Sequence, residues 1–201
     1  PDRWRNVDPW LKNAGVSWTD HFCDLEQLTD AGLDPKTVPS LRYEFALAFA
    51  AGRAVHADKF PAINPAKNID RTREWAGFSP WAMTENFQKL RSAFSYLKAF
   101  EEVGGTPEEV ANAKADVVYA MGLMGHYIGD AAQPLHSTVH HNGWVGANPH
   151  GYTTWPGFHS WIDGGFVAKA KVRFADIAPR VLPVEAIVLG GRLTGDTFAE
   201  R

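Results

Sequence analysis

The chain has 201 residues, of which 45% are hydrophobic and 21% charged, and its formal net charge is −3. This composition belongs to globular rather than disordered proteins, and the length suffices for one domain with a sizeable core. The slightly acidic balance gives no sign of a basic nucleic-acid surface, although bound divalent cations would invert the local field. The single cysteine, Cys23, excludes an intrachain disulfide, and no apolar run approaches the roughly eighteen residues of a membrane span.

The first forty residues are rich in Asp-Pro, glycine and proline, which predicts an irregular segment that wraps a helical body. The chain opens with Pro1-Asp2-Arg3-Trp4, with neither a methionine nor a signal peptide, so we expect a processed or truncated product. A helix capped by Ser40 is expected to run to about residue 55. It is apolar on nearly all sides, which predicts that it is buried.

Two longer helices are expected after a loop at residues 59–78. Ser79 and Pro80 are typical of a helix start, and the glycine pair at 104–105 of a helix end. Between them, apolar residues at three- and four-residue steps predict a stripe along one face, namely Phe87, Leu90, Phe94 and Leu97.

The second long helix is expected over about residues 107–133. Thr106-Pro107-Glu108-Glu109 combines a cap, a first-turn proline and acidic side chains at the positive end of the helix. Glycines near its other end predict a close approach of a neighbouring backbone, or simple helix packing; they are Gly122, Gly125 and Gly129.

The remainder predicts a long loop at 137–157 and a last substantial helix from 158 to about 174, which Gly164-Gly165 weakens. No strand-like alternation or internal repeat stands out. We therefore expect an all-α protein with a single domain over residues 1–201.

Residues 126–136, HYIGDAAQPLH, carry a candidate metal site. His126 and Asp130 are four residues apart, so on a helix they project from the same face. Pro134 cannot continue that helix without losing a hydrogen bond, which leaves His136 able to fold back towards the same point.

A second pair, His159 and Asp163, repeats the four-residue spacing. Imidazole and carboxylate ligands without a thiolate suit zinc, manganese or iron. Five such ligands exceed the need of one ion, so we expect a cluster in which a carboxylate bridges two metals. Such clusters stabilise the attacking and leaving oxygens of a phosphoryl displacement. Signatures of di-iron bundles, metalloproteases, serine hydrolases and phosphate-binding loops are all missing from the sequence.

The string HYIGDxxQPLH, followed by HxxxD 23 residues after His136, resembles the zinc-dependent single-strand-specific nucleases. Their relatives are the bacterial zinc-dependent phospholipases C. The resemblance implies a mostly helical fold with long loops around a cleft that holds a trinuclear zinc cluster. It also implies that Asp130 bridges two zinc ions, with a bridging water or hydroxide as the nucleophile, and that His136, His159 and Asp163 hold the other ion.

The resemblance extends to the N-terminal segment. The nucleases carry an Asp followed three residues later by an Arg, and further on a His-Phe-x-Asp segment. Asp2 to Arg5 and His21-Phe22-Cys23-Asp24 look similar. By that match Asp2 and His21 complete the zinc site of His126 and Asp130. Arg5 would stabilise charge on the phosphate, and Phe22 would stack on a base.

One departure concerns the third metal. In the family, an amino-terminal tryptophan and a histidine soon after it hold one zinc, and this sequence begins after that region. Two or three zinc ions are therefore expected, with the third site in doubt. A second departure is that Asn142 and Asn148 give no decisive match to the substrate-side asparagine of the family.

We thus expect a secreted or periplasmic zinc-dependent phosphodiesterase that cleaves single-stranded DNA or RNA and has possible 3′-nucleotidase activity. The alternatives are a zinc-dependent phospholipase C and an inactive metal-binding helical protein. Asp163 and the His-Phe-x-Asp segment favour the nuclease, because the phospholipases carry Glu in place of Asp163. The expected partner is single-stranded nucleic acid, without stable membrane association, and a monomer is favoured while the oligomeric state stays open.

Overall fold

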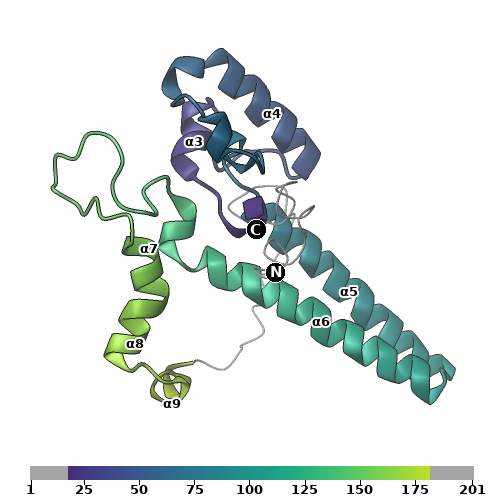
Figure 1. Cartoon of the computed structure of the whole chain (residues 1–201). Coiled ribbons are helices and arrows are strands. Elements are labelled where there is room, and N and C mark those ends of the chain that lie inside the picture. Colours follow the sequence, from purple (N-terminus) through teal and green to yellow (C-terminus); the bar gives the residue numbers. More distant parts are fainter. Residues whose placement is uncertain (1–17, 182–201) are drawn as a thin grey trace. The chain divides into compact units, whose positions relative to one another are not determined.

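The structure is a computed structural model, and it describes residues 18–181. Helices dominate this part of the chain (Figure 1), and its one strand-like feature is an isolated antiparallel bridge between Cys23 and Gly77. The all-α prediction is therefore confirmed for the described residues. None of their helices is long and apolar enough to cross a bilayer.

The described residues divide into two compact units, residues 18–138 and residues 139–181. They are called the first and the second unit below, and each is described by itself. The single domain over residues 1–201 stays a prediction.

The first unit is built from four α-helices and several short 3-10 turns. The α-helices are α3 (Leu25–Asp30), α4 (Arg42–Val55), α5 (Ser79–Val103) and α6 (Pro107–Ala131). The 3-10 turns are η1 (Trp18–His21), η2 (Ala57–Lys59), η3 (Pro65–Lys67), η4 (Thr72–Glu74) and η5 (Pro134–Ser137). The segment before residue 40 thus contains more helix than the sequence predicted.

Aromatic packing fixes α4 against the start of α5. Phe45 and Phe49 are fully buried, and the ring of Phe45 stacks on Trp81 with centroids 3.9 Å apart. The Trp81 indole also donates to the carbonyl of Pro39. Such stacked pairs contribute about 0.5–1.5 kcal/mol beyond the area they bury.

Two expectations for α4 were wrong. The helix is capped by Leu41 rather than Ser40. Its other face is open among the described residues, since Leu47 is 71% and Val55 76% exposed. The sequence showed apolar residues all round the helix, but only the Phe45–Phe49 face meets a partner there.

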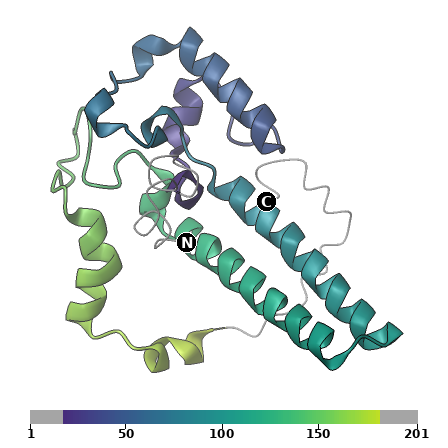
Figure 2. The same cartoon turned by 45° about the vertical axis from the view of Figure 1, so that its right-hand side comes forward.

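Helices α5 and α6 form an antiparallel pair that lies side by side in both views (Figures 1 and 2). Gly104 ends α5 with a φ of 100°, which favours glycine, and Thr106 and Glu109 form a capping box at the start of α6. Leu90 and Val117 are buried between the helices. The expected stripe on α5 is only partly buried, because Phe87 and Phe94 are about half exposed.

The glycines of α6 do not mark a close approach. At Gly122, Gly125 and Gly129, an added Cβ would meet no heavy atom of the described residues within 4 Å. That prediction was wrong for this part of the chain, and the glycines make α6 intrinsically weaker than alanines would.

The second unit consists of the loop 139–157 and a chain of short helical elements. These are α7 (Phe158–Ser160), η6 (Trp161–Phe166), α8 (Val167–Ala170), α9 (Phe174–Ile177) and η7 (Ala178–Arg180). The first three run on continuously, and η6 is a π-helix that contains Gly164-Gly165. The expected last helix therefore exists over 158–170, but its middle turn is wider than an α-helical one.

Candidate metal centre

The last turns of α6 carry the first two candidate ligands. The Nε2 atom of His126 lies 3.2 Å from Oδ2 of Asp130, so the four-residue spacing brings imidazole and carboxylate together as expected. Helix α6 ends at Ala131, and Pro134 opens the 3-10 turn η5. The predicted helix end before Pro134 is confirmed.

His21 reaches the same point from η1, more than a hundred residues away in the chain. Its Nδ1 atom lies 2.8 Å from Oδ2 of Asp130 and 3.0 Å from Nε2 of His126. The residue is only 4% exposed. Two ring nitrogens and one carboxylate oxygen therefore converge, and this group could hold a metal ion.

The spacing of these atoms is compatible with a small divalent metal ion such as zinc. Four ligands at zinc-like distances in a tetrahedron are separated by about 3.3 Å. The three separations in the structure, 2.8, 3.0 and 3.2 Å, are shorter than this. A bound ion would need the side chains to part by only a few tenths of an ångström.

His136 folds back to the other oxygen of the same carboxylate. Its Nδ1 atom lies 3.7 Å from Oδ1 of Asp130 and 2.6 Å from the carbonyl oxygen of His21. A carbonyl only accepts hydrogen bonds, so Nδ1 carries the proton and Nε2 is the lone-pair nitrogen. Metal-binding histidines are commonly oriented by such a bond to a backbone carbonyl.

The backbone around His21 is held from two sides. The Cys23 amide donates to the carbonyl of His136, while the amides of Phe78 and Ser79 donate to the carbonyls of Thr19 and Phe22. Burial of Cys23 raises the pKa of its thiol to about 12, so it stays a neutral core side chain.

Gly77 permits the close approach of these two segments. It has a φ of 104°, and an added Cβ would lie 2.0 Å from the Phe22 carbonyl oxygen. The antiparallel bridge to Cys23 therefore requires glycine at this position.

The surroundings of two acidic residues close to His21 in the chain, Asp20 and Asp24, were not predicted from the sequence. Asp24 is buried, and this burial, together with the neighbouring charge of Glu26, raises its pKa to about 7. A hydrogen bond from Gln27 has the opposite, smaller effect on that pKa. Burial also raises the pKa of Asp20 and outweighs the opposing effect of Arg42. Asp20 and Arg42 are too far apart in the sequence for any spacing pattern to connect them. Asp24 and Gln27 are three residues apart, so their hydrogen bond could have been predicted.

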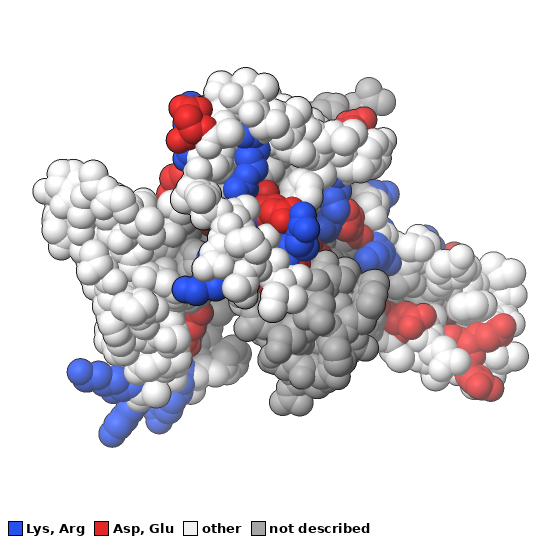
Figure 3. Space-filling view, turned by 45° about the horizontal axis from the view of Figure 1, so that its top comes forward, with Lys and Arg blue, Asp and Glu red and all other residues white. Residues whose placement is uncertain are grey.

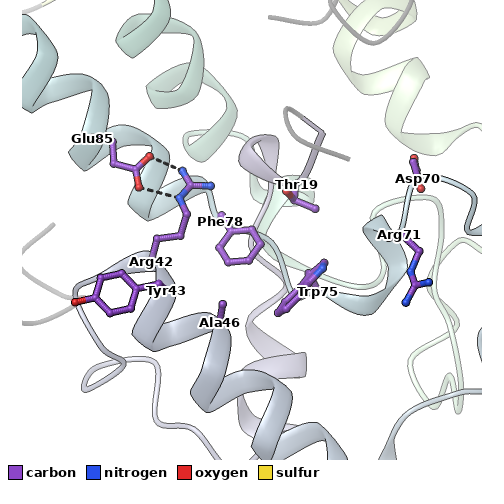
Figure 4. A pocket seen from close by; sticks show the side chains of 9 residues that line it. All are labelled: Thr19, Arg42, Tyr43, Ala46, Asp70, Arg71, Trp75, Phe78 and Glu85. Atoms are coloured by element: carbon purple, nitrogen blue, oxygen red, sulfur yellow. Dashed lines mark hydrogen bonds and ion pairs between the residues drawn. The ribbon is translucent and has the colours of Figure 1, made fainter. Parts of the chain in front are cut away.

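A cavity of about 520 Å³ in the first unit was also not predicted. It combines aromatic rings with two arginines and two acidic residues (Figure 4). The lining residues are Thr19, Arg42, Tyr43, Ala46, Asp70, Arg71, Trp75, Phe78 and Glu85.

The second unit holds the other predicted pair. Nε2 of His159 lies 2.9 Å from Oδ2 of Asp163, across the junction of α7 and η6. The Asp163 side chain is 44% exposed, against 16% for Asp130. His136 belongs to the first unit, whereas His159 and Asp163 belong to the second. Their grouping in one metal site therefore stays a prediction from the sequence.

The loop 139–157 is ordered by its own aromatic residues. His140 stacks on Trp144 with centroids 3.8 Å apart, and Trp144 contacts Tyr152. The Asn148 side chain donates to the carbonyl of Tyr152 and accepts from its amide, so it stabilises the backbone of the loop. Trp155 is about half exposed.

The remaining site predictions are only partly covered by the structure. Asp2 and Arg5 lie outside the described residues. Phe22 is half-buried directly after His21, and its predicted role in stacking on a base stays a prediction.

Comparison with known proteins identifies no family. No protein-family model matches the sequence, and neither a curated protein nor a solved structure gives a match. The functional argument therefore depends on the residues and on their geometry.

Proposed function

We propose that this protein is a zinc-dependent phosphodiesterase that hydrolyses single-stranded nucleic acid outside the cytoplasm. The observation that carries the proposal is the position of Asp130. Its Oδ2 atom faces His21 and His126, while its Oδ1 atom faces His136. Since Nδ1 of His136 carries a proton, a second ion beside Oδ1 would take the Nε2 lone pair of that ring, and Asp130 would then bridge the two ions.

The residues of the first unit would hold one ion between His21, His126 and Asp130, to which Asp2 is proposed to contribute. His136, with His159 and Asp163, is proposed to hold another, as the sequence motif predicts. Zinc ions bound in this way supply Lewis acidity for phosphate and lower the pKa of a bound water towards 7. The HxxxD spacing, the largely shielded carboxylate of Asp130 and the histidine oriented by a carbonyl all support this assignment.

The charge distribution is compatible with a substrate that is bound through metals and aromatic rings. On the face drawn in Figure 3, basic and acidic side chains are interspersed over the first unit. In the second unit, exposed basic residues follow one another at the end of α8 and beyond it, namely Lys169, Lys171 and Arg173. The half-exposed rings of Tyr152 and Trp155 offer surfaces on which bases can stack, as single-strand binders commonly do.

Substrate turnover tests the proposal. Purified protein loaded with zinc should hydrolyse single-stranded DNA and RNA, lose that activity after chelation, and regain it when zinc is restored. Turnover of phosphatidylcholine without turnover of nucleic acid would replace the nuclease by a phospholipase C. A protein that binds zinc but hydrolyses neither substrate would contradict the enzymatic assignment.

A further inference from the structure

An ion-pair network connects η1 with α4 and α5. Arg42, the first residue of α4, donates from Nε and Nη2 to the two carboxylate oxygens of Glu85, at 2.8 and 2.7 Å. Its Nη1 atom donates to Oδ1 of Asp20. Figure 4 shows the fork of Arg42 meeting Glu85 beside the cavity, which Thr19 of η1 also lines.

The geometry of this network fixes the orientation of the Arg42 guanidinium. A guanidinium that pairs with a carboxylate through two parallel hydrogen bonds has a defined orientation, which a lysine cannot reproduce. Glu85 therefore orients Arg42, and the remaining side of the guanidinium meets Asp20. The side chain of Asp20 is only 16% exposed, so this contact is largely shielded from water.

Asp20 directly precedes His21 in the four-residue turn η1. In a 3-10 helix successive side chains project about 120° apart, so fixing the direction of Asp20 also fixes the direction of His21. The backbone hydrogen bonds at Thr19 and Phe22 hold the ends of the turn. The contact between the side chains of Asp20 and Arg42 then fixes the rotation of the turn η1 between its two ends.

We propose that Arg42 is a positioning residue for metal binding: through Asp20 it holds the His21 imidazole at Asp130 and His126. This inference depends on the proposed metal site. The same network also joins α4 to α5, and a role limited to that connection would affect the stability of the fold without changing the metal affinity of the folded protein.

Zinc affinity of the folded protein separates the two roles. Competition with a chromophoric chelator, well below the unfolding transition, should show Arg42→Gln and Asp20→Asn each weakening zinc binding about tenfold or more, as outer-shell changes do. The double variant should lose little more than either single variant, because both remove the same contact. Arg42→Lys should recover part of the affinity.

The matched control is Arg71→Gln. Arg71 lines the same cavity but pairs with Glu74 rather than with Asp20. Its removal should leave zinc affinity unchanged. In cobalt-loaded protein, Arg42→Gln and Asp20→Asn should alter the visible absorption of the metal, whereas Arg71→Gln should not.

Two results would overturn the inference. One is wild-type zinc affinity in both Arg42→Gln and Asp20→Asn, whatever their thermal stability. The other is an equal loss in Arg71→Gln. If Arg42→Gln fails to fold, the nearly isosteric Asp20→Asn decides the question. A wild-type chain that binds no zinc would instead contradict the proposed function, and the inference would fall with it.

Discussion

The two units contain histidine–aspartate pairs of identical spacing but different surroundings. In the first unit, the pair His126 and Asp130 is joined by His21 from a distant part of the chain and by His136 from the 3-10 turn that follows α6. In the second unit, the pair His159 and Asp163 spans the start of a π-helix and leaves its carboxylate 44% exposed. The spacing brings each imidazole to its carboxylate, whereas the surrounding fold determines how many further ligands meet there.

Removing one histidine from each pair should separate the two pairs most clearly. His126→Ala should remove most of the rise in Tm that zinc produces, because the enclosed group of three donors loses a member. A ligand present at one hundred times its Kd stabilises a protein by about 2.7 kcal/mol, which sets the scale of the loss. His159→Ala should retain a substantial part of the rise. Thermal unfolding with and without zinc measures both, and equal losses would show that the surroundings of the pairs do not matter.

A substitution at Gly77 tests the contact between distant segments that holds the backbone next to His21. Gly77→Ala should destabilise the protein by about 3 kcal/mol or more, because the new Cβ meets the Phe22 carbonyl. Gly104→Ala is the control, since Gly104 has a similar φ of 100° and no described atom within 4 Å of the new Cβ. It should cost only about 1–2 kcal/mol for the left-handed conformation. Urea denaturation measures both, and equal costs would remove the argument for a close contact at Gly77.

Asp24 provides a pH-dependent test of the same segment. Its pKa of about 7 in the folded protein exceeds the usual value for aspartate, so its contribution to stability is complete at low pH. That contribution is lost as the pH rises from about 4 to about 7, by roughly 2–4 kcal/mol.

Asp24→Asn should remove this loss while keeping a hydrogen-bonding group beside Gln27. Urea denaturation of the zinc-free protein at pH 5 and pH 8 measures the effect. The variant should be the more stable protein at pH 8, and its advantage should shrink at pH 5. An unchanged difference between the two pH values would contradict the raised pKa.

The smallest effect is expected on α6, which carries the first pair. Gly122→Ala should stabilise the protein by roughly 0.5–1 kcal/mol, because the position is helical and its surroundings among the described residues are open. In α4, Gly52→Ala should instead destabilise, since its Cβ would meet the Ala31 carbonyl at 2.1 Å. A loss of stability in Gly122→Ala would reveal a neighbour at this face of α6. Chemical denaturation at one pH suffices for both variants.

Local patterns predicted the local features well. The spacing of His126 and Asp130, the helix end before Pro134 and the capping box at Thr106 all depend on residues within a few positions of one another. The exposed faces of α4 and α5 could not be predicted, because an apolar stripe does not say which neighbour covers it. The π-helical turn at Gly164-Gly165 likewise has no spacing signal.

Long-range features of the site needed either a family resemblance or the structure. His21 was proposed by resemblance alone, and the structure brings it to Asp130. The Asp20–Arg42–Glu85 network and the Gly77 contact join segments that carry no shared pattern. Their assembly depends on packing, which a single sequence does not display.

The central claim is that Asp130 bridges two metal ions, and metal stoichiometry tests it most directly. Elemental analysis of the zinc-loaded wild-type protein should give at least two zinc ions per chain. Asp130→Asn should lose both ions together, whereas His21→Ala should lose one. A single ion in the wild type, or Asp130→Asn that retains one ion at full affinity, would contradict the bridging role.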